Sequence, residues 1–524
     1  MSWRSTRASG QANRQVAVAD LGSNSWRLVI FSYGDGPWWK LTDELYETVR
    51  IGAGLAASGR LSDEAMARGL ETLSVFGRFA RANQIPSEDV HVVATSAIRD
   101  ATNGQDFLER AEAESGLKIE ILDADQEAFY GYVAAVNTST LTDGAVLDIG
   151  GGSLQLTRVE GRQNTEMASF PLGAVRTTEQ FLTERDPAHP AKRKALQRLR
   201  DHVDEQLSTA PWVTHLQPRP PRLVGIGGAV RNLAAAAQET QGSIDLGVQG
   251  FVITHAMLRE LVLTLAALPA AERGTVPGIK PGRGDIILAS AVVLERIVDV
   301  CGFAGIEATE AGLREGVFLG RVLLSPASPL IADVRGAAVR NLSIQYESDL
   351  RHVEHVARLS LQMFDSMVEA GLFTPRDDER ELLWAAAMLH DVGMTISYDD
   401  HHKHSRYLIV SAELPGWVPR ERALIAQITR YHRKGAPKLG EWTKLSRQGD
   451  EEMLDRCAMI LRLAEHLERG RDQSVHEAVL RTNGDGIGLH LLADGDLTLP
   501  RWSVERYGDD EAFERVFHRP LLIG

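Results

Sequence analysis

The sequence predicts a duplicated α/β core followed by a helical region. Two observations predict the core: apolar runs alternate with helix-forming segments through the first 325 residues, and one loop pattern occurs twice there. In that pattern a short apolar run ends in an aspartate and a glycine-rich turn. A third observation, a change to helical periodicity from about residue 331, predicts the second part.

The second copy of the loop pattern is the richer in glycine. Residues 144–147 form an apolar run short enough for a buried strand, and Asp148-Ile149-Gly150-Gly151-Gly152-Ser153 follows it. Glycine permits a tight turn whose successive N–H groups form a concave anion site. Ser153 adds a hydroxyl, and Asp148 at the strand end is placed to hold a divalent metal.

The first copy reads Asp20-Leu21-Gly22-Ser23-Asn24-Ser25 and follows the apolar residues 16–19; its aspartate precedes Asp148 by 148 − 20 = 128 residues. A third loop, Gly225-Ile226-Gly227-Gly228, follows another apolar pair. We therefore expect two related halves that contribute loops to one cleft, although three unrelated turns are the alternative. The candidate phosphate-binding residues are Gly22, Ser23, Asn24, Ser25, Gly150, Gly151, Gly152, Ser153, Gly227 and Gly228.

Length and composition indicate several soluble domains. The 524 residues exceed what one core usually organises, and 44% hydrophobic with 24% charged residues is ordinary for globular proteins. The two cysteines, Cys301 and Cys457, are far apart, which fits a reducing cytoplasm. Residues 1–13 are polar and basic, so we expect a disordered tail. Nothing approaches the ~20 apolar residues of a membrane span. The net charge of −14 argues against nucleic-acid binding.

Strands and helices alternate in the first half, residues 14–133. A hairpin is expected to continue through 26–32, and Ser62 is expected to cap a helix that begins with two acids. Residues 90–94 read as a strand, after which Arg99 lies where α/β proteins bind ligands. A surface arginine is the alternative. A further strand at 119–122 precedes a helix that we expect to run from about 125 to 136.

The second half, residues 134–325, repeats this alternation. We expect a strand at 154–159, a helix at 191–207, a strand, loop and helix over 223–233, and a buried helix from Ile286. Residues 331–474 are expected to be all helical, with one apolar face formed by positions 353, 356, 359, 363, 364 and 367. Residues 475–524 alternate again and predict a small C-terminal α/β domain.

These motifs together resemble the exopolyphosphatase and guanosine-pentaphosphate phosphohydrolase family. The resemblance covers most of the chain and depends on many segments, none specific alone. They are residues 20–25, 50–55, 94–100, 126–128, 148–153, 172–176, 225–228, 312–316, 384–393, 402–405 and 430–434.

The resemblance implies an actin-like, ribonuclease-H-like duplicated core of the ASKHA class, followed by an all-α domain of HD type. It implies Mg²⁺-dependent (or other divalent-cation-dependent) removal of the terminal phosphate from inorganic polyphosphate. The alternative substrate is guanosine pentaphosphate, with guanosine tetraphosphate as a related ligand. It also makes a homodimer plausible.

The resemblance assigns roles to four acidic or amide positions. Glu127 matches the family's catalytic glutamate, which we interpret as the general base for water; the preceding position holds Gln126 instead of an acid. Without the resemblance, Glu127 is an early-helix acid that complements the dipole. Asp148 and Asp20 are the expected metal carboxylates. Gln155 replaces a glutamate of the family pattern, which puts metal affinity in question. Arg99 is expected to stabilise the transferred phosphoryl group.

The helical region carries two further candidate sites. The first is an HD-type metal site formed by His352 (or His355), His390, Asp391 and Glu465. The second is a basic path for a polyphosphate tail, for which solvated charge runs are the alternative. Its residues are His402, Lys403, His404, Arg406, Arg430, His432, Arg433 and Lys434.

Other functions share some of these features. A kinase of the same fold would need an acceptor pocket, which the sequence does not identify. A non-catalytic regulator that binds polyphosphate or the alarmone is suggested by Gln155, and a nucleotide phosphohydrolase of HD type by His390-Asp391. A P-loop ATPase is disfavoured because residues 225–232 lack the Gly-Lys-Ser/Thr ending.

Overall fold

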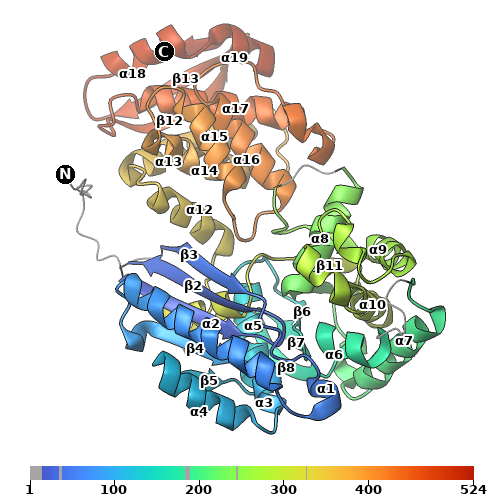
Figure 1. Ribbon diagram of the computed structural model, residues 1–524. Helices are drawn as coiled ribbons and strands as arrows, with labels where there is room; N and C mark the ends of the chain where they lie inside the picture. The colour runs from blue at the N-terminus through green and yellow to red at the C-terminus, as the bar shows by residue number, and fades with distance from the viewer. Residues whose placement is uncertain (1–13, 35–37, 183–188, 243–245, 326, 524) are drawn as a thin grey trace. The chain divides into compact units, whose positions relative to one another are not determined.

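The computed structural model describes residues 14–34, 38–182, 189–242, 246–325 and 327–523. It divides into two compact units, with the boundary between Val334 and Arg335 (Figure 1). The predicted disordered tail, 1–13, lies outside the described residues. Within the described part of the chain, no helix is both long and apolar enough to cross a membrane.

The first unit contains two mixed sheets. The first sheet has the strand order β3-β2-β1-β4-β5, where β1 pairs antiparallel with β2 and parallel with β4. The bounds are β1 Arg14–Leu21, β2 Trp26–Tyr33, β3 Trp39–Glu47, β4 Val90–Ala94 and β5 Ile119–Ile121.

Alternate residues of β1 pack on opposite faces of this sheet, as the strand period requires. Ala17 and Ala19 lie in a core that includes helices α2 (Asp63–Ala82) and α4 (Gly104–Ser115). Val16 and Val18 lie in another core with helix α5 (Ala124–Val136). As predicted, Ser62 caps α2: its hydroxyl accepts a hydrogen bond from the backbone N–H of Ala65.

The second sheet has the order β10-β11-β9-β6-β7-β8. Its part β8-β7-β6-β9-β11 repeats both the order and the strand directions of β3-β2-β1-β4-β5. The strands are β6 Gly144–Ile149, β7 Leu154–Glu160, β8 Gln163–Phe170, β9 Arg222–Ile226, β10 Val252–Thr254 and β11 Gly305–Ala308. The two halves predicted from the loop pattern therefore share one topology.

Helices surround this second sheet. The longer ones are α7 Arg193–Leu207, α8 Gly228–Thr240, α9 His255–Ala267 and α10 Gly284–Cys301, and the shorter ones in this unit are α1 Leu55–Ser58, α3 Ser96–Asp100, α6 Ala174–Thr177 and α11 Leu313–Phe318. Helix α10 is buried along most of its length, as predicted. Because β1 and β4 are parallel, and β6 and β9 are parallel, the loops after these strands meet at one edge of each sheet.

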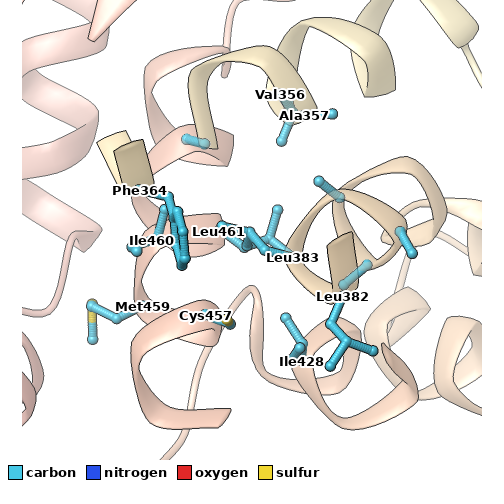
Figure 2. Close-up of a cluster of buried hydrophobic side chains, with 14 of the residues drawn as sticks. Val356, Ala357, Phe364, Leu382, Leu383, Ile428, Cys457, Met459, Ile460 and Leu461 are labelled. Carbon is cyan, nitrogen blue, oxygen red and sulfur yellow. The ribbon is translucent and has the colours of Figure 1, made fainter. Parts of the chain in front are cut away.

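The second unit is mainly helical. Its helices are α12 Val334–Gln345, α13 Leu350–Glu369, α14 Glu379–Leu389, α15 His401–Ser411, α16 Pro419–Tyr431, α17 Asp450–Leu467, α18 Thr498–Tyr507 and α19 Asp510–Phe517. The predicted apolar face of α13 is buried. Figure 2 shows Phe364, Leu383 and Leu461 meeting in the core between α13, α14 and α17.

The C-terminal sheet does not form a domain of its own, which corrects the prediction for residues 475–524. Strands β12 (Val475–Asn483), β13 (Gly486–Ala493) and β14 (Leu521–Ile523) form the sheet. Its side chains Val475, Leu480 and Leu489 belong to the same buried cluster as the helices. Period-two alternation predicted the strands but not their partner, because the apolar face of α13 lies more than 100 residues earlier in the chain.

Candidate functional site

The three predicted glycine loops meet around one cavity in the first unit. The first loop joins β1 to β2, the second joins β6 to β7, and the third leads from β9 into α8. The cavity has a volume of about 120 Å³. Most of the predicted phosphate-binding residues line it, namely Gly22, Ser23, Asn24, Ser25, Gly150, Gly151, Gly227 and Gly228.

Glycine in the second loop permits direct contact between the two halves. A Cβ atom on Gly151 would lie 2.7 Å from the Cβ of Ser23, and one on Gly152 would lie 2.5 Å from the hydroxyl of Ser96. Gly152 and Ser153 are not among the described residues that line the cavity. Gly152 instead packs against the first half, and Ser153 contacts Glu127.

Three carboxylates face the cavity: Asp20, Glu127 and Asp148. Burial raises the pKa of Asp20 to about 6, with Arg314 opposing the shift. Burial also raises the pKa of Glu127 to about 7 and that of Asp148 to about 7. The negative charges of Glu127 and Asp20 add to the shift at Asp148. Because the negative charges of these three acids repel one another, the site favours a bound positive charge among them.

Glu127 is held in the first turn of α5 and is 5% exposed. The Arg99 guanidinium donates from Nη1 to Glu127 Oε2 at 3.1 Å and to the carbonyl oxygen of Leu122 at 2.7 Å. The Ser153 hydroxyl lies 3.5 Å from the other carboxylate oxygen. Arg99 is not among the described residues that line the cavity, so it acts on Glu127 and not at the cavity surface.

Gln126 is part of the helix cap. Its side-chain oxygen accepts from the backbone N–H of Asp123 at 3.0 Å, and the Asp123 carboxylate accepts from the backbone N–H of Gln126 at 2.8 Å. This reciprocal pair is a capping box, in which glutamine and glutamate serve equally. Gln126 therefore serves the start of the helix, and the absence of an acid at this position does not alter the cavity.

Gln155 is not among the described residues that line the cavity. It is buried, and its Nε2 donates to the Ser153 hydroxyl at 2.9 Å and to the Ser169 hydroxyl at 3.4 Å. Its Oε1 has no hydrogen-bond partner among the described residues. Ser153 thus connects Gln155 to Glu127. Gln155, which the sequence placed near the metal, lies outside the wall of the cavity.

Four arginines that the sequence interpretation missed also line the cavity: Arg27, Arg231, Arg283 and Arg314. Burial lowers the pKa of Arg27, Arg231 and Arg283, and the charge of a neighbouring arginine lowers each of these pKa values further. This concentration of positive charge suits a polyanion. One signal was available: Arg231 and Arg314 follow their glycine loops by two or three residues.

The cavity fits a hard divalent cation. Asp20 Oδ1 is buried and without a hydrogen-bond partner in the described structure. Asp20 and Asp148 end the corresponding strands β1 and β6, so each half supplies one carboxylate. Carboxylate oxygens are the ligands that Mg²⁺ takes in proteins, usually one or two of them with several waters.

The second unit brings together all four predicted HD-type residues. His352 Nε2 lies 3.1 Å from Glu465 Oε2, and His390 Nε2 lies 3.3 Å from the same oxygen. Asp391 Oδ2 is 3.7 Å from His352 Nε2. The alternative ligand, His355, faces Glu468 at 3.4 Å and is not part of this group.

The predicted basic path is only partly exposed. His402 and His432 are completely buried, so they cannot contribute to a surface path, which corrects those two assignments. Arg406 pairs with Glu441, hydrogen-bonds Gln427 and lies over the Trp442 ring. The sequence predicted one basic path because it does not show that α15 buries His402 and Ser405 while Lys403 stays exposed. The more accessible members are Lys403, His404, Arg430, Arg433 and Lys434.

Sequence comparison identifies both units. The profile of the Ppx/GppA phosphatase family matches residues 29–325, and the profile of Ppx/GppA phosphatase domain III matches residues 334–497. The chain is 28% identical over 482 residues to the guanosine-5′-triphosphate,3′-diphosphate pyrophosphatase of Vibrio vulnificus, covering 91% of this chain and 92% of the relative.

Solved structures resemble about 60% of the chain. The Ppx/GppA family member of Aquifex aeolicus is 28% identical, with a TM-score of 0.51 over 60% of this chain and 98% of that chain. An exopolyphosphatase of Cytophaga hutchinsonii has a TM-score of 0.53 at 23% identity, covering 59% of this chain and 97% of that chain. The duplicated sheets are thus the actin-like core of these proteins.

Proposed function

Because this chain belongs to the Ppx/GppA phosphatase family, we propose that its first unit hydrolyses the terminal phosphoanhydride bond of inorganic polyphosphate and releases orthophosphate. One observation carries the proposal: a buried, oriented glutamate faces a cavity made of glycine loops and arginines. Phosphoanhydride hydrolysis requires positioning and charge stabilisation more than covalent chemistry, and this cavity supplies both.

Substrate binding follows from the loops and arginines. The backbone N–H groups of the glycine turns and the hydroxyls of Ser23 and Ser25 are suited to the oxygens of the terminal phosphates. Arg231 and Arg314 add charge from the second half. Together they neutralise and orient the transferred group.

Glu127 is the base in this proposal. Arg99 fixes one carboxylate oxygen, while the cavity side remains available to a water molecule. Glu127 takes a proton from this water, whose oxygen bonds to the terminal phosphorus. The bridging P–O bond breaks, and its electron pair stays on the leaving phosphate chain. Arg99 is a positioning residue in this scheme.

A divalent cation, for which Mg²⁺ is the natural candidate, would be held by Asp20 and Asp148. It would supply charge neutralisation of the phosphate oxygens and would relieve the repulsion among the three acids. Gln155 orients Ser153 beside Glu127 and is not assigned to the cation.

Guanosine pentaphosphate is the second candidate substrate, because the Vibrio vulnificus relative is named for its action on that nucleotide. The cavity favours the simpler polyanion. Tyr46 is the one aromatic residue among the described side chains that line it, so it offers a single ring to stack a base.

Phosphate release from long polyphosphate, guanosine pentaphosphate and ATP, measured side by side with Mg²⁺, tests this function. We expect polyphosphate to give the highest kcat/KM, and Asp148→Asn to remove activity on every substrate. A preference for guanosine pentaphosphate would exchange the two candidates. Binding without any phosphate release would instead indicate a non-catalytic regulator and overturn the proposed function.

A further inference from the structure

A chain of ion pairs connects the two halves of the first unit and ends at Glu127. It begins in the second half at Arg176, whose Nη2 donates to Asp100 Oδ2 at 2.8 Å. Asp100 Oδ1 lies 3.5 Å from Arg99 Nε, and Arg99 Nη1 donates to Glu127 Oε2 at 3.1 Å. Neither Arg176 nor Asp100 is among the described residues that line the cavity, and the proposed mechanism assigns neither of them a role.

Arg176 is fastened to the second glycine loop. Its Nε donates to the carbonyl oxygen of Gly152 at 2.9 Å, and its backbone N–H donates to the carbonyl oxygen of Gly151 at 3.2 Å. The backbone N–H of Val175 donates to the same Gly151 oxygen at 2.8 Å. The position of the Arg176 guanidinium is therefore fixed to this loop, whose N–H groups are suited to the terminal phosphates.

Arg99 has two carboxylates within reach, and they differ in distance. Glu127 accepts from Arg99 at 3.1 Å and is buried, whereas the Asp100 oxygen lies at 3.5 Å and its side chain is 39% exposed. Burial raises the pKa of Glu127 to about 7, the charge of Arg99 opposes this rise, and the charge of Asp100 adds to it. The two acids therefore interact, and they compete for one guanidinium.

Arg176 decides this competition in favour of Glu127. Arg99 and Arg176 are the ion-pair partners of Asp100 among the described residues, and the contact to Arg176 is the shorter, 2.8 Å against 3.5 Å. Because opposite charges attract more strongly at a shorter distance, Asp100 is held mainly by Arg176, and Arg99 remains with Glu127. Without Arg176, the Asp100 carboxylate would attract Arg99 alone and would draw it away from the base.

A surface ion pair without function is the alternative, since the side chains of Arg176 and Asp100 are 30% and 39% exposed. Pairs this exposed contribute little to the free energy of unfolding, and this alternative predicts no change in catalysis when the pair is removed. Two further contacts argue against it, because they place the pair between the phosphate loop and the residue that holds the base. They are the hydrogen bond from Arg176 to Gly152 and the contact of Asp100 with Arg99.

We propose that Arg176 is a positioning residue for the hydrolytic reaction, because it binds Asp100 and so leaves Arg99 with the base. The inference rests on the proposed function, in which Glu127 takes a proton from the attacking water. Arg176 does not line the cavity, so it acts on the base through the ion pairs. Its attachment to the second glycine loop aligns the base with the loop that holds the terminal phosphate.

Phosphate release from polyphosphate by the full-length enzyme, at saturating Mg²⁺, tests the role of Arg176. Arg176→Ala should lower kcat by about tenfold, because a small displacement of a catalytic group is costly. Its KM should change by less than about threefold, since the N–H groups of the glycine loop remain. Asp100→Asn should keep kcat within about threefold of the wild type, because it removes the charge that competes for Arg99.

The double variant Asp100→Asn/Arg176→Ala separates the two contacts of Arg176. With no competing carboxylate, Arg99 should stay with Glu127, and kcat should return to within about threefold of that of Asp100→Asn. A double variant as slow as Arg176→Ala would mean that Arg176 acts only by holding Gly152, and this result overturns the proposal. An Arg176→Ala enzyme with the wild-type kcat overturns it as well.

Arg158→Ala is the matched control. Arg158 also belongs to the second half, its side chain is 27% exposed, and it pairs with Glu166 at 2.7 Å. This pair joins β7 to β8, so its removal should leave kcat and KM unchanged. A loss of kcat equal to that of Arg176→Ala would show that removing any paired arginine slows the enzyme, which contradicts the proposal. Circular dichroism melts show whether each variant is folded.

Crystal structures of the variants provide a readout that does not depend on activity. In Arg176→Ala the contact of Arg99 with Asp100 should shorten and that with Glu127 should lengthen, and the double variant should restore the contact with Glu127. An active enzyme in which Arg176→Ala leaves the distance from Arg99 to Glu127 unchanged contradicts only this inference. A wild type that releases no phosphate contradicts the proposed function, and the variant structures then still decide whether Arg176 positions Glu127.

Discussion

At the scale of single residues, the proposed mechanism assigns proton transfer to Glu127 and the orientation of its carboxylate to Arg99. Glu127 lines the cavity, and Arg99 donates to one of its two carboxylate oxygens, Oε2. Glu127→Gln keeps the shape and the hydrogen bond capacity but cannot take a proton at neutral pH. We expect kcat for phosphate release to fall by about 10²–10⁴ while substrate binding stays close to that of the wild type.

The neighbouring residue supplies the control for this change. Gln126→Glu alters the charge one position earlier in the chain, yet the capping box accepts either side chain. Its kcat should stay within about twofold of the wild type, since a cap affects the start of α5 and not the chemistry. A Glu127→Gln enzyme that retains more than a third of the wild-type kcat would exclude Glu127 as the base.

The residues that sequence predicted and those it missed differ in a physical way. Glycine loops and the acids at strand ends are local patterns, so Asp20, Asp148 and the turns were visible in the chain. Arg27 and Arg283 reach the cavity from β2 and from the residue before α10, and no local pattern connects them to the loops. Similarly, His401 lies beside His432 only because α15 and α16 pack together.

At the scale of elements, the start of α5 determines where Glu127 lies. The Asp123 carboxylate accepts from the backbone N–H of Gln126, and Gln126 returns the interaction. Asp123→Ala removes this cap and should lower the free energy of unfolding by about 1 kcal/mol. Urea denaturation of the full-length chain measures the change.

Asp123→Ala should change the turnover rate only slightly, although it removes the helix cap. Arg99 still donates to the Glu127 carboxylate and to the carbonyl oxygen of Leu122, and these two hydrogen bonds keep Glu127 in place. We expect kcat to change by less than about fivefold. A loss as large as that of Glu127→Gln would mean that the cap, and not Arg99, positions the base.

The third glycine loop connects backbone conformation to the site. Gly227 has a φ of +98°, and a Cβ there would lie 2.8 Å from the carbonyl oxygen of Ile149 and 3.1 Å from Asp148 Oδ1. Gly227→Ala therefore adds a steric contact to the strain of an extended positive-φ conformation, which alone costs about 1–3 kcal/mol. We expect both lower stability and a raised Mg²⁺ requirement for phosphate release.

Gly161 is the matched control for this loop. It also has a positive φ, +54°, but a Cβ there meets nothing within 4 Å. Gly161→Ala should cost about 1–2 kcal/mol of stability and leave the Mg²⁺ requirement unchanged. If the two variants differ only in stability and share the same Mg²⁺ requirement, Gly227 has no part in shaping the site around Asp148.

At the scale of the whole molecule, the sequence predicted the two halves and the helical region because each is marked by its own periodicity. The strand order repeats because both halves begin with the same strand, acid and glycine pattern. The C-terminal sheet was predicted as a domain because alternation alone does not show which core a strand joins. Val475 and Leu489 complete the core of the helices.

The second unit also allows a test of substrate length. The loop cavity of the first unit is large enough for only the terminal phosphates, so a long chain needs further cations. Among the residues predicted for a tail path, Lys403 pairs with Asp400, whose side chain is 44% exposed, so this contact contributes little. Arg433 and Lys434 line an open cavity. Arg406 is excluded because it pairs with Glu441.

We expect the triple variant Lys403→Ala/Arg433→Ala/Lys434→Ala to raise the KM for long polyphosphate by about tenfold or more at low salt, since each lost phosphate contact weakens binding and salt screens the rest. The KM for guanosine pentaphosphate should change by less than about twofold, because that ligand has too few phosphates to extend beyond the loops.

A triple variant at the exposed residues Arg447, Arg481 and Arg501 removes the same charge elsewhere in the unit. If both triple variants raise the KM equally, net charge alone is responsible. If neither does, the tail of the substrate makes no contact with these cations, and the tail-path prediction is wrong.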